Sequence, residues 1–227
     1  MRHFTIKNKM RRFAKVKKTL HNNEKKGICV TKFGKIIGSS EGAGVVAHSN
    51  CNNSFESGLN NFISYKNKNV FSGMKWQCVE YARRYLITKL GVTFSSVDGA
   101  EDVFALKTVE SIKNGKKYKF KSYKNNLNCQ LKDNMPKVHD VIIWARNKDD
   151  TPYGHIAVIL KIEGDKLFIG EQNWSNDAWI ILPPHTYSRI LTLKTNNNRC
   201  SIVDGNYKIL GWKRALQEMP ISLIKNP

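Results

Sequence analysis

The sequence lacks any long hydrophobic run, and no apolar stretch in its 227 residues approaches the roughly 18 needed to cross a membrane. It is also poor in acidic residues, with 18 Asp and Glu against 38 Lys and Arg, which gives a formal net charge of +20. The first absence predicts a chain without a transmembrane segment. The second favours acidic partners, although a lysine-rich solvated surface explains the same charge.

Sequence patterns for metal sites and disulfide frameworks are absent as well. The five cysteines are odd in number, widely spaced and contain no C-x-x-C pair, and the six histidines show no H-E-x-x-H spacing. We therefore predict no metal, no cofactor and no disulfide framework, which suits a reducing compartment and a cytoplasmic location. The cysteines are Cys29, Cys51, Cys78, Cys129 and Cys200.

The length allows one sizeable core, and we expect one domain at residues 29–215, between a basic extension (1–28) and a C-terminal tail (216–227). The first 26 residues hold ten Lys or Arg against one acid, and no apolar segment of the secretory type follows them. Apolar residues from Met10 to Leu20 recur at helical spacing. An organelle transit peptide, a helix on a membrane surface and a solvated tail all fit this extension.

One cysteine, Cys78, stands where a loop turns into an amphipathic helix. We expect this helix to begin between Ser72 and Trp76 and to run to about Leu90, with Gly91 ending it. The positive end of a helix favours ionisation of a thiol, and the thiolate is the nucleophilic form. Cys78 is therefore a candidate nucleophile, although for this stretch alone a half-buried packing cysteine is the better explanation.

The remaining pattern predicts an α+β fold, with N-terminal helices packed on a mostly antiparallel sheet. A second helix is expected from about Gly99 to Asn114, because Asp98 and Glu101 resemble a capping box before an apolar segment. Residues 50–69 are rich in Asn and Ser, which is typical of an irregular loop. The main strand-like runs are residues 138–145, 155–162, 166–171, 190–193 and 207–212.

Lysines alternate with aromatic residues in the connection at residues 116–135, around Tyr118, Phe120 and Tyr123. Such alternation can serve nucleic-acid binding, but a half-exposed strand or a long surface loop produces it too. Because no recognised nucleic-acid-binding module surrounds the segment, we expect no nucleic-acid partner.

A nucleophilic cysteine needs a base, and the base needs a third group to orient it. His155 is the best placed histidine, since it opens a strand directly after Gly154 and would expose its ring at the end of a sheet. His48 and His139 flank strands and stay open as alternatives. The other three, in the basic extension or a proline loop, are His3, His21 and His185.

The hairpin after His155 supplies the third group, Glu171. If its turn comprises the three residues 163–165, Ala157 faces Glu171, and Glu171 becomes a diagonal neighbour of His155 on one face of the sheet. A turn of two or four residues would put Glu171 on the other face, as a solvent-facing acid at the sheet edge. The interpretation therefore depends on an odd-length turn.

Four sequence segments, taken together, indicate a known family: KWQCVEYARR at residues 75–84, GHIAVI at 154–159, EQN at 171–173 and ILGW at 209–212. Together they resemble the CHAP family of cysteine, histidine-dependent amidohydrolases and peptidases. Within it they are most similar to the amidase domain of glutathionylspermidine and trypanothione synthetase-amidases. The resemblance covers about Thr31 to Trp212, and the run at residues 76–84 is its specific part.

This resemblance implies a papain-like fold and a cysteine amidase with a thioester intermediate. Cys78 would be the nucleophile, His155 the general base and acid, and Glu171 the orienting group. Bifunctional members of the family carry a large ATP-using synthetase domain, for which this sequence shows no counterpart. The resemblance therefore implies amide hydrolysis only, without ATP.

Three further residues are candidates for substrate binding by resemblance. Gln77 and Asn173 flank the triad and would donate hydrogen bonds to the substrate or to an oxyanion. Arg83 resembles an arginine that contacts the glutathione part of the substrate, and an ordinary surface arginine is the alternative. The backbone N–H of Cys78 is the expected oxyanion donor.

The implied substrate is a small-molecule conjugate of glutathione and a polyamine, although a protein of charge +20 should repel a polyamine. Peptidoglycan peptide cleavage, as in other CHAP domains, is the second reading and would need export. A non-enzymatic basic binding module, for nucleic acid or a membrane surface, is the third. The sequence leaves the oligomeric state open.

Overall fold

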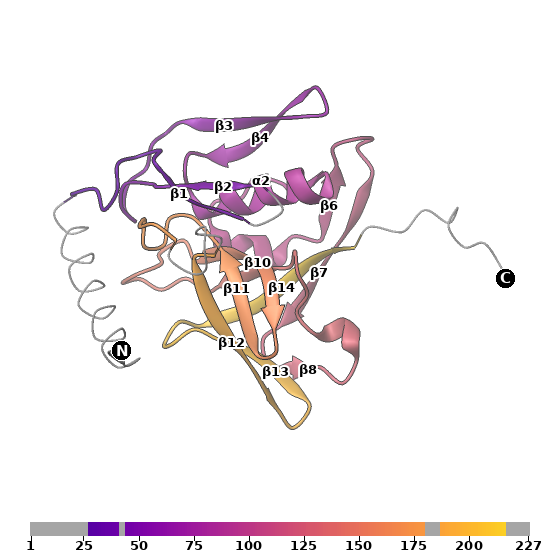
Figure 1. Ribbon diagram of the computed structural model, residues 1–227. Helices are drawn as coiled ribbons and strands as arrows, with labels where there is room; N and C mark the ends of the chain where they lie inside the picture. Colours follow the sequence, from indigo (N-terminus) through magenta and orange to yellow (C-terminus); the bar gives the residue numbers. More distant parts are fainter. Residues whose placement is uncertain (1–26, 41–43, 180–186, 217–227) are drawn as a thin grey trace, which may run out of the picture.

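The computed structural model describes residues 27–40, 44–179 and 187–216. A ten-stranded sheet dominates it, and the helix α2 (Cys78–Leu90) lies between this sheet and a separate hairpin, β3–β4 (Figure 1). Every strand pair is antiparallel. The expected α+β fold with a mostly antiparallel sheet is thus confirmed, while α2 is the one α-helix in these ranges.

The large sheet has the spatial order β5-β6-β7-β14-β9-β10-β11-β12-β13-β8. In that order its strands are Val92–Thr93, Thr108–Ser111, Lys117–Lys124, Ile209–Leu216, Val141–Trp144, His155–Glu163, Lys166–Gly170, Arg189–Asn196, Arg199–Val203 and Leu127–Asn128. Two small sheets pair β1 (Ile36–Ser39) with β2 (Val46–His48), and β3 (Asn60–Tyr65) with β4 (Lys68–Met74). The short 3-10 helices are η1 (Ala100–Ala105) and η2 (Lys132–Asn134).

Strand β9 and residues 156–159 of β10 are buried on both faces, which explains why these stretches are apolar without a break. Because side chains alternate along a strand, Ile143 and Ile156 join one core with α2, while Ile142 and Ala157 join a second core on the other side. The sheet therefore separates two cores, and α2 covers only one of them.

Helix α2 ends where the sequence predicts, at Leu90, with Gly91 in the left-handed conformation at φ 65°. Its beginning is later than expected. Residues up to Met74 belong to β4, and Gln77, in an extended conformation, is the N-cap residue. The predicted start between Ser72 and Trp76 is thus wrong, and Cys78 becomes the first residue of the helix.

The predicted second helix, 99–114, is wrong. Only the turn of η1 forms, and its cap is one residue later than expected: Asp102 accepts a hydrogen bond from the Gly99 N–H at 2.9 Å. The chain then enters β6, where Val109 and Ser111 point into the protein. Pairing of β6 with β7 buries Val109, so the tertiary contacts of a strand replace the helix that the apolar spacing indicates.

The predicted irregular loop at residues 50–69 is also wrong in its second half, which forms the hairpin β3–β4. Lys66 and Asn67 connect the two strands, and both have positive φ, 46° and 64°. Positive φ at both central residues is typical of the tight turn that joins antiparallel strands, and asparagine tolerates it well. Asn67 therefore marks the turn of a hairpin. The predicted basic helix at residues 10–20 lies outside the described residues.

Two disulfides, Cys29–Cys51 and Cys129–Cys200, contradict the prediction of no disulfide framework. Cys78 is the free cysteine. Disulfides persist mainly in oxidising compartments, so the cysteine pattern no longer supports a cytoplasmic location. Among the described residues, no helix is long and apolar enough to cross a membrane.

Candidate active site

The thiol of Cys78 lies at the N-terminus of α2 and is 9% exposed. The first backbone N–H groups of a helix have no partner within it, and together with the helix dipole they favour negative charge at this end. Burial of the following face, with Tyr81 and Ala82 against the sheet, fixes where the helix begins. The fold thus holds the free thiol at the positive end of α2.

The imidazole of His155 opens β10, beside Trp144 of β9, and is 2% exposed. Its Nε2 atom lies 2.8 Å from Oε2 of Glu171, and the Cys78 thiol is close enough to raise the pKa of the imidazole. Because Nε2 faces Glu171, Nδ1 is the ring nitrogen available to the sulfur. The structure therefore brings Cys78, His155 and Glu171 together in the predicted order.

The turn between His155 and Glu171 differs from the predicted one, although the register next to Glu171 is as predicted, with Val158 paired to Gly170 and Ile159 to Ile169. Glu163 pairs with Lys166, so the turn has two residues and not three, and Gly164 occupies its first position with φ 58°. A β-bulge between Ile159 and Lys161 then shifts the register by one residue. A two-residue turn alone would put Glu171 on the face of the sheet opposite His155. The bulge moves Glu171 back to the face that carries His155, so the carboxylate still reaches the ring.

Glu171 is 2% exposed and receives hydrogen bonds from three side chains. Arg189 donates through Nε to Oε1 at 2.6 Å and through Nη2 to Oε2 at 3.1 Å, and Ser188 Oγ donates to Oε1 at 3.0 Å. Burial would raise the pKa of Glu171, but the charge of Arg189 and the hydrogen bond with His155 outweigh it and lower the pKa to about 2. Glu171 is therefore an anion at neutral pH.

The same pairing makes His155 a strong base. Burial lowers the pKa of its imidazole, but the charge of the Cys78 thiolate, the hydrogen bond to it and Glu171 together raise the pKa to about 9. A protonated imidazole beside a thiolate is the state that thiol enzymes use for attack on a carbonyl.

The sequence argument missed Arg189 and Asp204. Arg189 pairs with Ile169 across β11 and β12, which places it diagonally next to Glu171. Its Nη1 atom donates to both carboxylate oxygens of Asp204, at 2.9 and 2.8 Å. The register of β12 would have revealed this contact, but the long connection after Glu171 hides it in the sequence.

Gln77 and Asn173 lie beside the triad and contact each other. Asn173 Nδ2 donates to Gln77 Oε1 at 2.7 Å, which turns the Gln77 amide nitrogen towards the carbonyl of Phe55, 3.1 Å away. The buried side chain of Asn50, which the sequence argument also missed, donates to Phe55 O and to Asn173 Oδ1. These amides hold the segment on either side of the cysteine in place.

Arg83 does not lie with these residues. It is 3% exposed and donates to the carbonyls of Ser72, Phe94 and Ser95 at 2.8, 3.2 and 3.2 Å, so the surface-arginine alternative is wrong. Burial lowers the pKa of Arg83 to about 10, against the opposing effect of Glu80. Its contacts connect α2 to β4 and to the segment that follows β5.

The two alternative histidines have other partners. His48 stacks on Trp76 with ring centroids 4.0 Å apart, and its Nδ1 atom lies 3.0 Å from Gly34 O. His139 Nδ1 lies 2.8 Å from the hydroxyl of Tyr85. Of the histidines in the described ranges, His155 is thus the one that joins Cys78 to a carboxylate.

Trp174 forms a wall of the site. Its ring centroid lies 4.7 Å from that of His155 and 5.0 Å from that of Tyr207, and the guanidinium of Arg189 lies 4.1 Å from it. One aromatic ring therefore covers two charged members of the cluster and separates them from water. Within the described part of the chain, no group of His, Cys, Asp and Glu is arranged to hold a metal ion.

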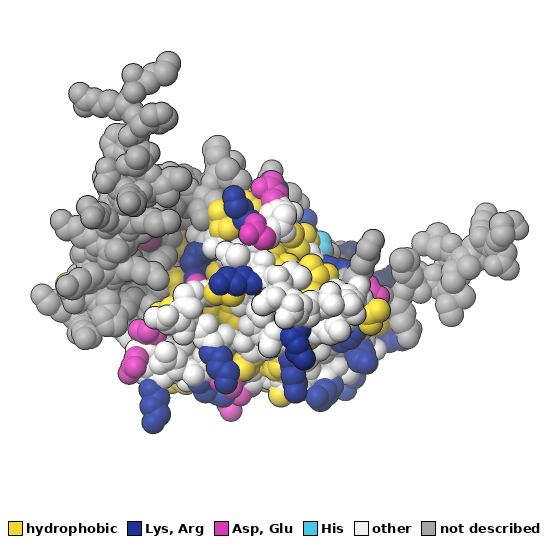
Figure 2. Space-filling view, turned by 90° about the horizontal axis from the view of Figure 1, so that it is seen from below, with side chains coloured by type: hydrophobic (Ala, Val, Ile, Leu, Met, Phe, Trp, Pro, Cys, Tyr) yellow, Lys and Arg dark blue, Asp and Glu magenta, His cyan; other side chains and the backbone are white. Residues whose placement is uncertain are grey.

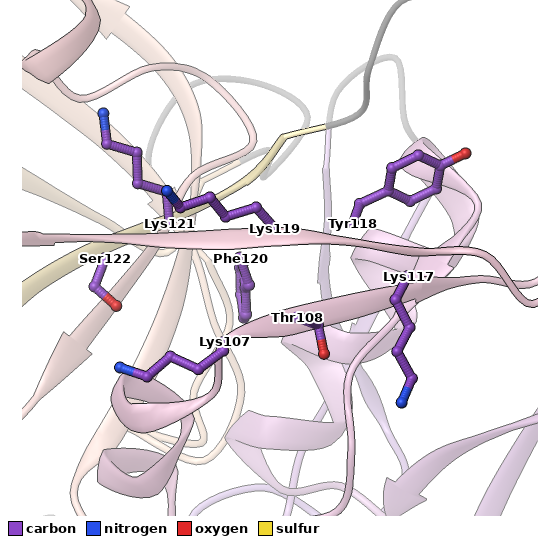
Figure 3. Close-up of a pocket in the computed structure, with 8 residues that line it drawn as sticks. All are labelled: Lys107, Thr108, Lys117, Tyr118, Lys119, Phe120, Lys121 and Ser122. Atoms are coloured by element: carbon purple, nitrogen blue, oxygen red, sulfur yellow. The ribbon is translucent and has the colours of Figure 1, made fainter.

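A separate cavity of about 570 Å³ lies on β6 and β7, away from these residues (Figure 3). It is lined mainly by Lys107, Lys117, Lys119 and Lys121, with Tyr118 and Phe120. The basic-aromatic segment thus contributes a largely exposed strand, β7. Figure 2 shows lysine and arginine side chains spread singly over one face of the protein, a distribution that fits a solvated surface.

Comparison with known proteins gives one family match and several relatives. Residues 69–173 match the model of the CHAP domain. The chain is 29% identical over 156 residues to the bifunctional glutathionylspermidine synthetase/amidase of Escherichia coli (strain K12), which covers 67% of this chain and 24% of that protein.

Two proteins of Crithidia fasciculata are similar to a comparable degree. Trypanothione synthetase is 28% identical over 172 residues, 76% of this chain and 24% of that protein. Glutathionylspermidine synthase is 28% identical over 142 residues, 62% of this chain and 19% of that protein. The chain thus matches about a quarter or less of the length of these relatives.

Proposed function

Because this chain carries a CHAP domain at residues 69–173, we propose that it is a cysteine-dependent amide hydrolase. Cys78 is the nucleophile, His155 the general base and acid, and Glu171 the group that orients and charges His155. The observation that carries this proposal is the buried 2.8 Å contact between His155 and Glu171, on a ring whose pKa the thiol at the start of α2 raises.

The reaction follows from these positions. The Cys78 thiolate adds to the amide carbonyl, and the oxyanion that forms is stabilised by the Cys78 backbone N–H and by the second N–H of the Gln77 amide, whose first N–H donates to Phe55 O. His155 gives its proton to the leaving amine, and a thioester remains on the sulfur. His155 then takes a proton from water, the hydroxide attacks the thioester, and the carboxylic acid and the thiol are released. No redox or nucleotide cofactor is consumed.

For the substrate we propose the amide between a carboxyl group of glutathione and a polyamine. The names of these relatives support this class, since each of them refers to glutathionylspermidine or trypanothione. We propose that Gln77 and Asn173 contact the substrate directly. Arg83 is occupied by backbone carbonyls, so its contribution would be indirect, through the segment at Phe94 and Ser95 that it holds.

A peptide amide of peptidoglycan is the second candidate, and a specific observation favours it. The disulfides Cys29–Cys51 and Cys129–Cys200 fit an oxidising, extracytoplasmic environment, where peptidoglycan would be available. The same thiol chemistry applies to both amides, so the two candidates differ only in the substrate that the site binds.

A parallel assay separates these candidates. Wild type and Cys78→Ala are incubated with glutathionylspermidine and, separately, with peptidoglycan peptides, and released amines are quantified by mass spectrometry. Release of spermidine by the wild type alone supports the first candidate, and release of peptide amines alone supports the second. Hydrolysis that survives Cys78→Ala contradicts the thiol mechanism. Steeply salt-dependent binding to polyanions without hydrolysis of any amide would favour the basic binding module.

A further inference from the structure

Glu171 is not the last member of the charged cluster. Arg189 donates to both oxygens of its carboxylate, including the Oε2 that contacts His155. Asp204 lies beyond Arg189, and the shortest N–O distances at the two contacts of Arg189 are 2.6 and 2.8 Å. The indole nitrogen of Trp144 donates to Asp204 at 3.0 Å and fixes that carboxylate in turn. Five side chains thus form a row in which the sign of charge alternates from the thiolate to Asp204.

The row is sheltered from solvent by the surrounding elements. The side chains of Arg189 and Asp204 are 21% and 14% exposed, and the Trp174 ring lies over the guanidinium. The titratable groups that face Glu171 are His155 from β10 and Arg189 from β12, while Asp204 faces Arg189 after β13. Tyr207 also interacts with Asp204 and Arg189 by charge, and its hydroxyl contacts Asp150 at 3.3 Å. In such a site, screening by water and salt is weak.

An arginine beside a triad carboxylate works against the triad unless it is itself balanced. The guanidinium keeps Glu171 ionised and oriented, but its positive charge also opposes the positive charge that His155 carries during the reaction. Asp204 accepts two hydrogen bonds from the same guanidinium and cancels most of this opposition. Arg189 can therefore fix the position of Glu171 without reducing the support that Glu171 gives to the imidazolium.

We propose that Arg189 and Asp204 are positioning residues that extend the triad into a five-membered row, in which Arg189 holds Glu171 and Asp204 neutralises Arg189 so that the thiolate–imidazolium pair is stable at neutral pH. This role rests on the proposed function. It has a signature that a merely structural pair would not give. Removing the negative charge and removing the positive charge must shift the titration of the Cys78–His155 pair in opposite directions.

The sign follows from the charge that each change leaves behind. The titration of the pair has two limbs, ionisation of the Cys78 thiol and deprotonation of the His155 imidazolium. Asp204→Asn adds one net positive charge near the pair, which favours the thiolate and disfavours the imidazolium, so both limbs move to lower pH. Arg189→Gln removes one positive charge, and both limbs move to higher pH. We expect each shift to be about one pH unit. This is the lower end of the range for neighbouring charges, because Glu171 lies between the changed residue and the Cys78–His155 pair.

Alkylation of Cys78 measures this without knowledge of the substrate. The other four cysteines are in disulfides, so iodoacetamide reports on one sulfur, and its rate against pH gives both limbs. The matched control is Asp165→Asn, the same chemical change at an exposed position in the β10–β11 turn. Limbs of Asp204→Asn that coincide with those of the control would overturn the proposal, as would shifts of both row variants in the same direction.

Two further variants keep the test decisive. If Arg189→Gln fails to fold by circular dichroism, Arg189→Lys replaces it. Lysine keeps the positive charge but cannot donate to Glu171 and Asp204 at once as the guanidinium does. The titration limbs of this variant should therefore stay close to those of the wild type, while kcat falls. Limbs of Arg189→Lys displaced as far as those of Asp204→Asn would contradict the charge argument. In the double variant Arg189→Gln/Asp204→Asn the two shifts should largely cancel.

His155→Ala distinguishes failure of this inference from failure of the proposed function. If His155→Ala leaves the alkylation profile unchanged, no thiolate–imidazolium pair exists, and both proposals fall. If no amide is hydrolysed and yet the limbs of Asp204→Asn and Arg189→Gln move apart, the inference stands and only the substrate assignment fails.

Discussion

Two buried glutamates, Glu80 and Glu171, lie close together in this protein and resemble each other in burial and in having an arginine partner. Each is at most 2% exposed and paired with an arginine, Arg84 for the first and Arg189 for the second. They are linked through Gln172, which follows Glu171 in the chain and donates to Glu80 at 3.0 Å. Nevertheless one is a structural anion and the other belongs to the candidate active site.

The difference lies in the remaining donors. Besides Arg84, Glu80 accepts hydrogen bonds only from neutral groups, namely Asn61 at 2.9 Å, Ser72 at 2.9 Å and Gln172. Glu171 gives one of its oxygens to an imidazole instead. A buried ion pair by itself is thus compatible with a purely structural role, and a titrating partner is what allows a carboxylate to take part in proton transfer.

The largest expected effect is on activity at Glu171. Glu171→Gln removes the charge that orients and stabilises the imidazolium, so kcat/KM should fall by about 10³- to 10⁴-fold, while Arg189 keeps Asp204 as its partner. Steady-state kinetics with whichever amide proves to be the substrate measures this. Activity within a few-fold of the wild type would place Glu171 in the same structural class as Glu80.

The second effect, on stability, belongs to Glu80. Glu80→Gln leaves Arg84 buried without its charge partner, which should cost about 3–5 kcal/mol. For a chain of this size that lowers Tm by roughly 10 °C, measurable by differential scanning calorimetry, while kcat/KM changes far less than in Glu171→Gln. A variant that keeps its Tm and loses its activity would reverse the comparison.

A third measurement uses pH. The pKa of His155 is raised from 6.5 to about 9, and its protonated form donates to the leaving amine, so activity is present below this pKa and is lost as pH rises through about 9. Glu171→Gln removes part of the cause, so the alkaline limb of kcat/KM should move down towards 6.5. Glu80→Gln serves as the control, and a limb that moves equally in both variants would show that the two carboxylates act alike.

The smallest effects compare single hydrogen bonds. Ser188→Ala removes one donor to Glu171, and Ser72→Ala removes one donor to Glu80. Each bond contributes about 1 kcal/mol. We expect the first change to lower kcat/KM by roughly fivefold and the second to lower Tm by about 2–4 °C. The comparison fails if Ser188→Ala affects only Tm.

The sequence predicted the parts of the site that local rules determine. The C-terminal end of α2 at Leu90 and Gly91 follows from apolar spacing and from the need for a left-handed residue. The position of His155 at the start of a strand follows from the apolar run after it. Both are properties of a few consecutive residues, and both are confirmed.

The wrong predictions concern features that depend on partners far away in the chain. Val109 lies in a strand because β7 pairs with it, although its neighbours have helical spacing. Cys29 and Cys51 are bonded because the segments that carry them run side by side, with the Val30 N–H donating to Cys51 O. Arg189 reaches Glu171 only through the register of β11 and β12. None of these contacts leaves a local signal.

The β-bulge at Leu160 has a consequence for how this hairpin can change in length. Side chains on a strand alternate between two faces, so His155 and Glu171 meet only if the number of residues between them has the correct parity. The two-residue turn alone gives the wrong parity, and the bulge corrects it. Deleting Leu160, or inserting one residue in the turn, would rotate Glu171 to the opposite face, whereas both changes together would restore it. In proteins that keep this hairpin, its length should therefore vary in steps of two, with bulge and turn gained or lost as a matched pair.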